Sequence, residues 1–168
     1  KQFGFILLIL SISSFSFSSQ KDESESQPEL KHIIQGEFES FFGKGWQFLW
    51  NLNSTPHRIF GQSIPQDFDA SDPIASEYAA RDFIFNHPSL FNIYEENLDL
   101  WVNEQHGNLR YLIFNQVYEN IPVWNGRIDF RYRLNGDLVM IGHDAFPNLN
   151  VNTNPGISMD EAISYSKI

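Results

Sequence analysis

Residues 127–142 constrain the fold more than any other part of this 168-residue chain. Polar and apolar residues alternate on both sides of Asn135-Gly136, which predicts two β-strands that each bury one face. Asn and Gly tolerate the positive φ angles of a type I′ turn, so a two-residue hairpin loop is expected here. The expected cross-strand pairs are Leu134 with Asp137, Tyr132 with Val139, Phe130 with Ile141, and Ile128 with His143.

This register assigns one face of the hairpin to the core, because side chains alternate between the two faces of a sheet. The expected core face carries Ile128, Phe130, Tyr132, Leu134, Val139 and Ile141. The opposite face carries Arg127, Asp129, Arg131, Arg133, Leu138 and Met140. Arg127 would face Asp144 as an exposed ion pair, worth about 0.5 kcal/mol.

A helix is predicted before this hairpin. It begins at Asp72-Pro73, an N-cap carboxylate followed by proline at the first helical position. Its apolar stripe is Ala75, Ala79, Ala80, Phe83 and Ile84. It ends at His87, because the residue before Pro88 is pushed out of the α region. A short strand at 98–102 and a long strand from Leu109 follow, so we expect an α+β fold in which the helix packs on an antiparallel β-meander.

The N-terminal third divides by composition. Residues 1–19 have a basic start, a short apolar stretch and small residues at the end, the pattern of a secretory signal peptide; the stretch is too short for a stable membrane anchor. Residues 20–35 are polar and are predicted to be a disordered acidic linker. Residues 36–72 are rich in Phe and Trp and predict a segment that packs against its own domain. The sequence leaves open whether this segment and the later strands form one domain.

Charge and cysteine content narrow the class of protein. The chain has a net charge of −10 and no cysteine. Nucleic-acid binding needs clustered Lys and Arg, so no nucleic-acid partner is expected. A secreted protein without disulfides is more typical of bacteria than of animals. We therefore expect a soluble extracellular bacterial protein.

No motif for catalysis is recognisable. The five histidines, at 32, 57, 87, 106 and 143, are not spaced for a helix-borne metal site. The sequence also has no glycine-rich phosphate loop, no Gly-x-Ser-x-Gly and no cysteine nucleophile. We therefore predict no catalytic residue, no metal ligand and no cofactor for this chain.

Residues 114–124 carry a resemblance to a known family. The sequence Phe-Asn-Gln-Val-Tyr-Glu-Asn-Ile-Pro-Val-Trp resembles the Q-x-Y-x-G-I-P-V-x-G core of the fungalysin/thermolysin propeptide (FTP) family. The residues that carry it are Gln116, Tyr118, Ile121, Pro122, Val123 and Trp124, followed by Asn135 and Gly136 in the next hairpin. Asn120 stands where the family commonly has glycine, but Asn also tolerates positive φ.

The end of the chain extends this resemblance. Ser158-Met159-Asp160-Glu161 predicts a capped helix start, and residues 157–163 look like the I-S-x-x-E-A helix where a PepSY domain begins. The resemblance thus divides the chain into an FTP-like propeptide domain at 73–150 and, at 151–168, a connector with the first helix of a truncated PepSY-like domain.

The resemblance implies that the chain is the N-terminal pro-region of a secreted zinc metallopeptidase precursor, cut from a longer protein. Such a pro-region acts as an intramolecular chaperone and inhibitor, and its partner is its own downstream catalytic domain. Zinc, with calcium as a further ion, would belong to that missing domain. We expect Trp124 and Arg131 to contact it.

Two alternatives remain open at the level of sequence. The chain could belong to a non-enzymatic secreted protein that uses propeptide-type modules for inhibition or binding. It could also be the pro-region of another secreted hydrolase, such as a cysteine peptidase. The sequence downstream of Ile168 distinguishes them, since a metallopeptidase would carry His-Glu-x-x-His and a distal Glu.

Overall fold

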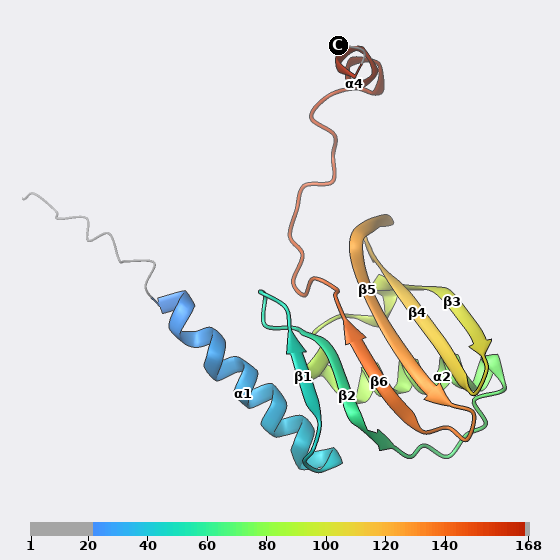
Figure 1. Cartoon of the computed structure of the whole chain (residues 1–168). Helices are drawn as coiled ribbons and strands as arrows, with labels where there is room; N and C mark the ends of the chain where they lie inside the picture. The colour runs from blue at the N-terminus through green and yellow to red at the C-terminus, as the bar shows by residue number, and fades with distance from the viewer. Residues whose placement is uncertain (1–21, 167–168) are drawn as a thin grey trace, which may run out of the picture.

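A six-stranded antiparallel sheet forms the centre of the protein. The computed structural model describes residues 22–166, and the expected signal peptide at 1–19 lies outside this range. The strands are β1 (Gln47–Trp50), β2 (Pro56–Ile64), β3 (Leu98–His106), β4 (Leu109–Tyr118), β5 (Ile121–Arg133) and β6 (Leu138–His143). Their order in the sheet is β1-β2-β6-β5-β4-β3 (Figure 1). The predicted meander, β3 to β6, is therefore extended by β2 and β1, which join it beside β6.

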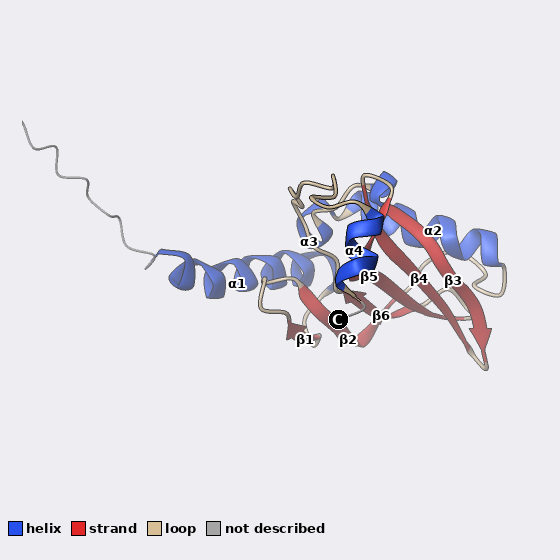
Figure 2. Ribbon diagram, turned by 90° about the horizontal axis from the view of Figure 1, so that it is seen from above, coloured by secondary structure: helices blue, strands red, loops and turns tan. Residues whose placement is uncertain are grey.

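Helices cover one face of this sheet. They are α1 (Asp22–Phe42), α2 (Pro73–Asn86) and α3 (Pro88–Phe91), with a short 3-10 turn, η1 (Glu95–Asn97), before β3. Figures 1 and 2 show α2 and α3 on the same side of the strands and α1 at the β1 edge, with its C-terminal end against the sheet, so the sheet is open on its other face within the described residues. The predicted α+β class is confirmed.

The core lies between the sheet and α2. The helix begins as predicted, with the Asp72 side chain accepting hydrogen bonds from the backbone N–H groups of Ile74 and Ala75. Its buried side chains are Ser76, Ala80, Phe83 and Ile84, so the buried face is turned slightly from the predicted stripe. Across the sheet, Leu112, Phe114, Ile128, Phe130 and Tyr132 are fully buried.

The predicted disordered linker at 20–35 is wrong for residues 22–35, because they form the first part of α1. Glu, Gln, Lys and Leu are good helix formers, so a polar segment can be helical when a later turn is anchored. The anchor is Phe38, which is 4% exposed and packs edge-on against Trp46 and Phe48. Since β1 and β2 are strands of the same sheet, residues 36–72 belong to the same domain as residues 73–150.

The predicted type I′ turn at Asn135-Gly136 is wrong. The loop has three residues, closed by the Arg133 N–H donating to Asp137 O (2.8 Å) and the Gly136 N–H donating to Arg133 O (2.9 Å). Only Gly136 has positive φ, at 89°, whereas a type I′ turn needs positive φ at both central residues. The Cβ of any other residue would also lie 2.4 Å from Phe68 O, which excludes side chains at this position.

The longer loop changes part of the predicted register. Phe130 faces Ile141 and Ile128 faces His143 as predicted, but a bulge places Tyr132 opposite Leu138 instead of Val139. Leu138 is therefore buried, and Val139 is only half-buried. The predicted pair of Leu134 with Asp137 is not formed, because Arg133 bonds to Asp137 in its place.

The last helix, α4 (Met159–Tyr165), has the predicted capping box of Ser158 and Glu161. None of its side chains is buried, and Figure 1 shows it at the end of an extended connector, away from the sheet. None of the helices in the described range is long and apolar enough to cross a membrane.

Candidate functional site

The residues of the family-like motif form the tip of the β4–β5 hairpin. Tyr118 pairs with Ile121, and Glu119 and Asn120 between them have φ angles of 49° and 64°. Positive φ at both central residues is the mark of a type I′ turn, so this turn occurs here and not at Asn135-Gly136. The backbone at Asn120 is left-handed, as expected for a residue in the position of the motif's glycine.

A large bulge follows this turn in β5. Asn115 pairs with Arg127 and Val117 pairs with Pro122, so Gln116 alone on β4 faces the four residues 123–126 on β5. Within the bulge Asn125 has a φ of 60°. Asn125 occupies the position of the last glycine in the Q-x-Y-x-G-I-P-V-x-G motif. Trp124 projects from the bulge and is 87% exposed. Bulges re-aim side chains and often lie beside functional sites, so the tip is the first candidate site.

Gln116 fastens this tip to the point where the chain leaves the sheet. Its side chain is buried, with Nε2 donating to Phe146 O and Oε1 accepting from the Phe146 N–H, both at 2.8 Å. The bulge residue Gly126 makes room for it, since a Cβ there would lie 2.7 Å from Gln116 Oε1. The motif glutamine therefore has a structural role that its sequence position did not reveal.

Replacing Gln116 by alanine is expected to lower the free energy of unfolding by about 1–3 kcal/mol, because both hydrogen bonds to Phe146 are lost from a buried site. Hydrogen exchange should be faster at the Phe146 amide than in the wild type. Gln116→Glu is the control, since it keeps the acceptor for the Phe146 N–H but not the donor. Unchanged exchange at Phe146 in Gln116→Ala would contradict the assigned role.

The remaining predicted residues divide between two places. Ile121, Pro122 and Val123 lie at the hairpin tip with Trp124, and Tyr118 precedes the turn half-buried. Asn135 and Gly136 lie in the loop at the other end of β5, so they are not part of this site. Arg131 lies on the open face of the sheet, with its guanidinium carbon 4.8 Å from the ring centroid of Tyr111.

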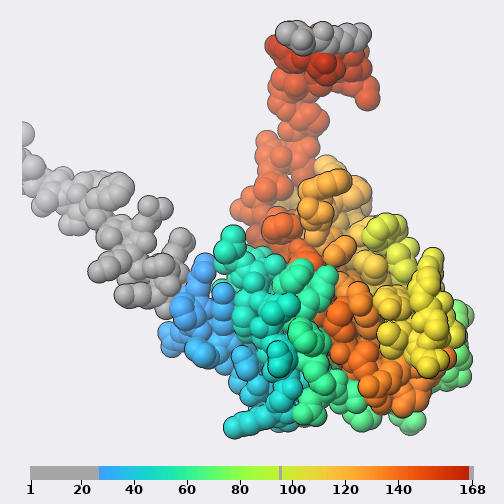
Figure 3. Space-filling model, in the orientation of Figure 1, coloured from blue at the N-terminus to red at the C-terminus, as the bar shows by residue number. Residues whose placement is uncertain are grey.

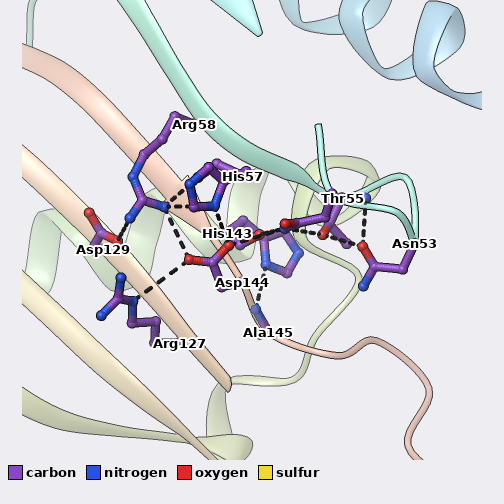
Figure 4. A network of polar contacts seen from close by, with 10 residues as sticks. Asn53, Thr55, His57, Arg58, Arg127, Asp129, His143, Asp144 and Ala145 are labelled. Atoms are coloured by element: carbon purple, nitrogen blue, oxygen red, sulfur yellow. Dashed lines mark hydrogen bonds and ion pairs between the residues drawn. The ribbon is translucent and has the colours of Figure 1, made fainter. Parts of the chain in front are cut away.

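A polar cluster on the open face was missed by the sequence reasoning. Its centre is Asp144, which contacts one imidazole, two guanidinium groups and one amide: His57 Nδ1 (2.6 Å), Arg58 Nη1 (3.2 Å), Arg127 Nε (3.7 Å) and Asn51 Nδ2 (3.1 Å) (Figure 4). The predicted Arg127–Asp144 pair is thus present, but the Asp144 side chain is only 18% exposed. Burial alone would raise the pKa of Asp144, but hydrogen bonds from His57, Asn51 and Arg58 outweigh it and hold the pKa below its ordinary value.

Arg58 extends the cluster across three strands. From β2 its guanidinium reaches over β6 to Asp129 on β5, with Nη2 3.5 Å from Asp129 Oδ2. The absence of a side chain at Gly142 permits this crossing, because a Cβ there would lie 2.6 Å from Arg58 Nη1. Asp129 is 5% exposed, and its Oδ1 has no hydrogen-bond partner among the described residues. The cluster therefore depends on Arg58 for its charge balance.

His143 lies beneath the cluster, on the core side. It is fully buried, with Nε2 2.8 Å from Phe91 O and Nδ1 3.3 Å from the Ala145 N–H. A carbonyl accepts and an N–H donates, so the imidazole is neutral with its proton on Nε2. Burial lowers its pKa from 6.5 to about 4, although the Phe91 carbonyl and the Asp144 charge oppose this shift.

Two concave regions meet at the start of β5. One, of about 500 Å³, is lined by Asn51, His57, Asn125, Arg127, Asp144 and Phe146. The other, of about 320 Å³, lies beside Trp101 and Trp124; both include Asn125 and Arg127. No group of three His, Cys, Asp or Glu side chains suited to a metal ion occurs in residues 22–166. The two regions are lined by indole rings, amides and guanidinium groups, which can bind a ligand through apolar contacts and hydrogen bonds.

Comparisons with known proteins give one distant likeness. No family model matches the sequence, and no curated protein matches it. Among solved structures, the fold is similar to the C-terminal domain of YpeB from Bacillus megaterium, with a TM-score of 0.49 and 11% sequence identity. The match covers 81% of this chain and 72% of that one.

Proposed function

We propose that this chain is the N-terminal pro-region of a secreted zinc metallopeptidase precursor, which acts as a folding template and inhibitor of its downstream catalytic domain. The observation that carries the proposal is the backbone of the hairpin tip. At Asn120 and Asn125, the two positions where the propeptide motif has glycine, φ is 64° and 60°. The residue types differ from the motif, but they keep the left-handed conformation for which glycine is used.

The exposed surface supports a role in binding. Trp124 stands clear of the sheet, and the open face beside it carries Arg131. Trp and Arg are the residue types most often found at the energetic centre of protein interfaces. In the space-filling view the tip around residue 120 forms the upper rim of the domain (Figure 3). A catalytic domain docked there would contact the tip and the open sheet face together.

We further propose that a PepSY-type domain begins at helix α4. Its apolar side chains Met159 and Ile163 lie one turn apart on the same face and are both exposed, although such a face is normally buried against another element. Further chain after Ile168 would supply that element. Zinc and calcium are proposed for the catalytic domain and not for the residues of this chain.

The test measures how the purified chain inhibits the downstream catalytic domain and how it promotes the refolding of that domain. Trp124→Ala and Arg131→Ala are each expected to weaken inhibition of that domain by about tenfold, the effect of losing one interface anchor. Tyr78→Ala is the control, because Tyr78 is 73% exposed but lies on α2, which packs on the other face of the sheet. Inhibition that is equally strong in all three variants would overturn the assignment of this surface.

A further inference from the structure

Two exposed tryptophans flank β4, and each projects from a bulge. On β3, Leu100 pairs with Phe114 and Val102 with Ile113, so Trp101 is the extra residue of a bulge. On the other side of β4, Trp124 lies in the four-residue bulge opposite Gln116. The indoles are 63% and 87% exposed. Exposing two large apolar rings by two separate interruptions of the sheet costs stability without improving the core, which points to a ligand.

The two rings border the cavity of about 320 Å³. Pro122 adds to its apolar wall, while Asn115, Asn125 and Arg127 supply polar groups. An apolar pocket with a few convergent polar groups is the usual form of a binding site. A cavity lined by two indole rings and two asparagine amides suits an extended chain with apolar side chains and peptide groups, as in the aromatic grooves that bind proline-rich segments.

Arg127 gives the lining of this cavity a positive charge, which favours a negatively charged ligand. Its side chain is 41% exposed, and its contact with Asp144, at 3.7 Å, is longer than that of Arg58, at 3.2 Å. Asp144 is already held by His57 at 2.6 Å and Arg58 at 3.2 Å. The guanidinium of Arg127 can therefore also bind an incoming carboxylate, to which it is matched in shape.

We propose that the Trp101–Trp124 cavity binds an extended acidic segment of a partner polypeptide. A prolyl or aliphatic side chain of the segment packs against the indoles, and a neighbouring Asp or Glu carboxylate pairs with Arg127. The proposal deepens the proposed function, on which the identity of the partner as the catalytic domain rests. Peptide binding itself does not depend on that identity.

The experiment is selection of a random dodecamer phage library on the immobilised chain, followed by tryptophan-fluorescence titration with the enriched peptide. We expect enriched sequences with Pro or an aliphatic residue next to Asp or Glu. Trp101→Ala and Trp124→Ala should each weaken binding at least about tenfold. Arg127→Gln should abolish the preference for that peptide over its Glu→Gln or Asp→Asn form. Tyr94→Ala is the control, since Tyr94 is 73% exposed but outside the cavity.

Three results would overturn the proposal. They are the absence of enrichment, enrichment of basic sequences, and binding that survives loss of both tryptophans. Binding of cellohexaose or laminarihexaose in place of any peptide would show that the cavity takes a sugar. If peptides bind as expected while refolding of the catalytic domain is unaffected by the chain, the cavity proposal stands and the pro-region function fails.

Discussion

Replacing Arg58 by methionine is expected to lower the free energy of unfolding by about 3 kcal/mol, the lower end of the range for breaking a buried ion pair. Methionine keeps much of the apolar stem but removes the only guanidinium within residues 22–166 that contacts both Asp129 and Asp144. Asp129, already with one unpartnered oxygen, would then be buried without a counterion. Urea denaturation of the wild type and the variant measures the loss.

Two further variants make this prediction specific. Adding Asp129→Asn to Arg58→Met should recover much of the lost stability, because the charge that Arg58 balanced is removed. Arg133→Met should cost less than about 1 kcal/mol, since the Arg133 side chain is 59% exposed in its pair with Asp137. Equal losses for Arg58→Met and Arg133→Met would show that the three-strand cluster contributes no more than a surface ion pair.

Acidification is expected to destabilise the protein by about 3 kcal/mol between pH 6.5 and about 4 through His143 alone, at 1.36 kcal/mol for each unit of pKa difference. The pKa of His143 is lower in the folded state, so the unfolded chain binds more protons in this range. The stability that depends on neutral His143 is fully present above pH 6.5 and is lost as the pH falls from 6.5 to about 4. Asp144 affects the stability only at lower pH, because its pKa in the folded state lies below 3.8.

The measurement is the pH dependence of the free energy of unfolding in His143→Gln. Glutamine can still donate to the Phe91 carbonyl but does not titrate, so the variant should lack this part of the slope between pH 6.5 and 4. His106→Gln is the control, because the His106 side chain is 64% exposed. A slope in His143→Gln as steep as that of the wild type would show that other groups cause the acid sensitivity.

Local signals predicted the elements that local chemistry determines. Asp72, Pro73 and Pro88 located α2 because capping and proline act within a few residues. The core face of β5 was correct because alternation is intrinsic to a strand. The pairing of β2 with β6 joins residues such as Ile59 and Ile141, and no pattern within either segment specifies a partner so distant in sequence.

The two turns show how pairing overrides local preference. Asn135-Gly136 suits a type I′ turn, yet Gly136 alone takes positive φ, packed closely against the Phe68 carbonyl. Glu119 is a poor choice for positive φ, yet it adopts 49° because Tyr118 and Ile121 are paired around it. Residue preferences at a turn are small compared with the cost of moving the two strands that it joins.

The candidate site was predicted in part. Trp124 and Arg131 came from the motif and the strand pattern, whereas Trp101 was missed. The signal for it was present, since Leu100-Trp101-Val102 breaks the alternation of a strand and such a break suggests a bulge. Of the Asp144 cluster only the Arg127–Asp144 pair was predicted, from the hairpin register; the contact of His57 could not be found in this way, because His57 and Asp144 are 87 positions apart.

Gln116 has a mechanical consequence for any force applied through the connector. Tension that pulls on the chain beyond Thr153 is borne first by the hydrogen bond from the Thr153 hydroxyl to the Glu119 carboxylate, and then by the two hydrogen bonds of the Gln116 amide to Phe146. That same side chain packs against Gly126, in the bulge that carries Trp124. Tension on the connector is therefore transmitted to the hairpin tip. In return, a partner bound at Trp124 makes the chain at Phe146, where it leaves the sheet, more rigid.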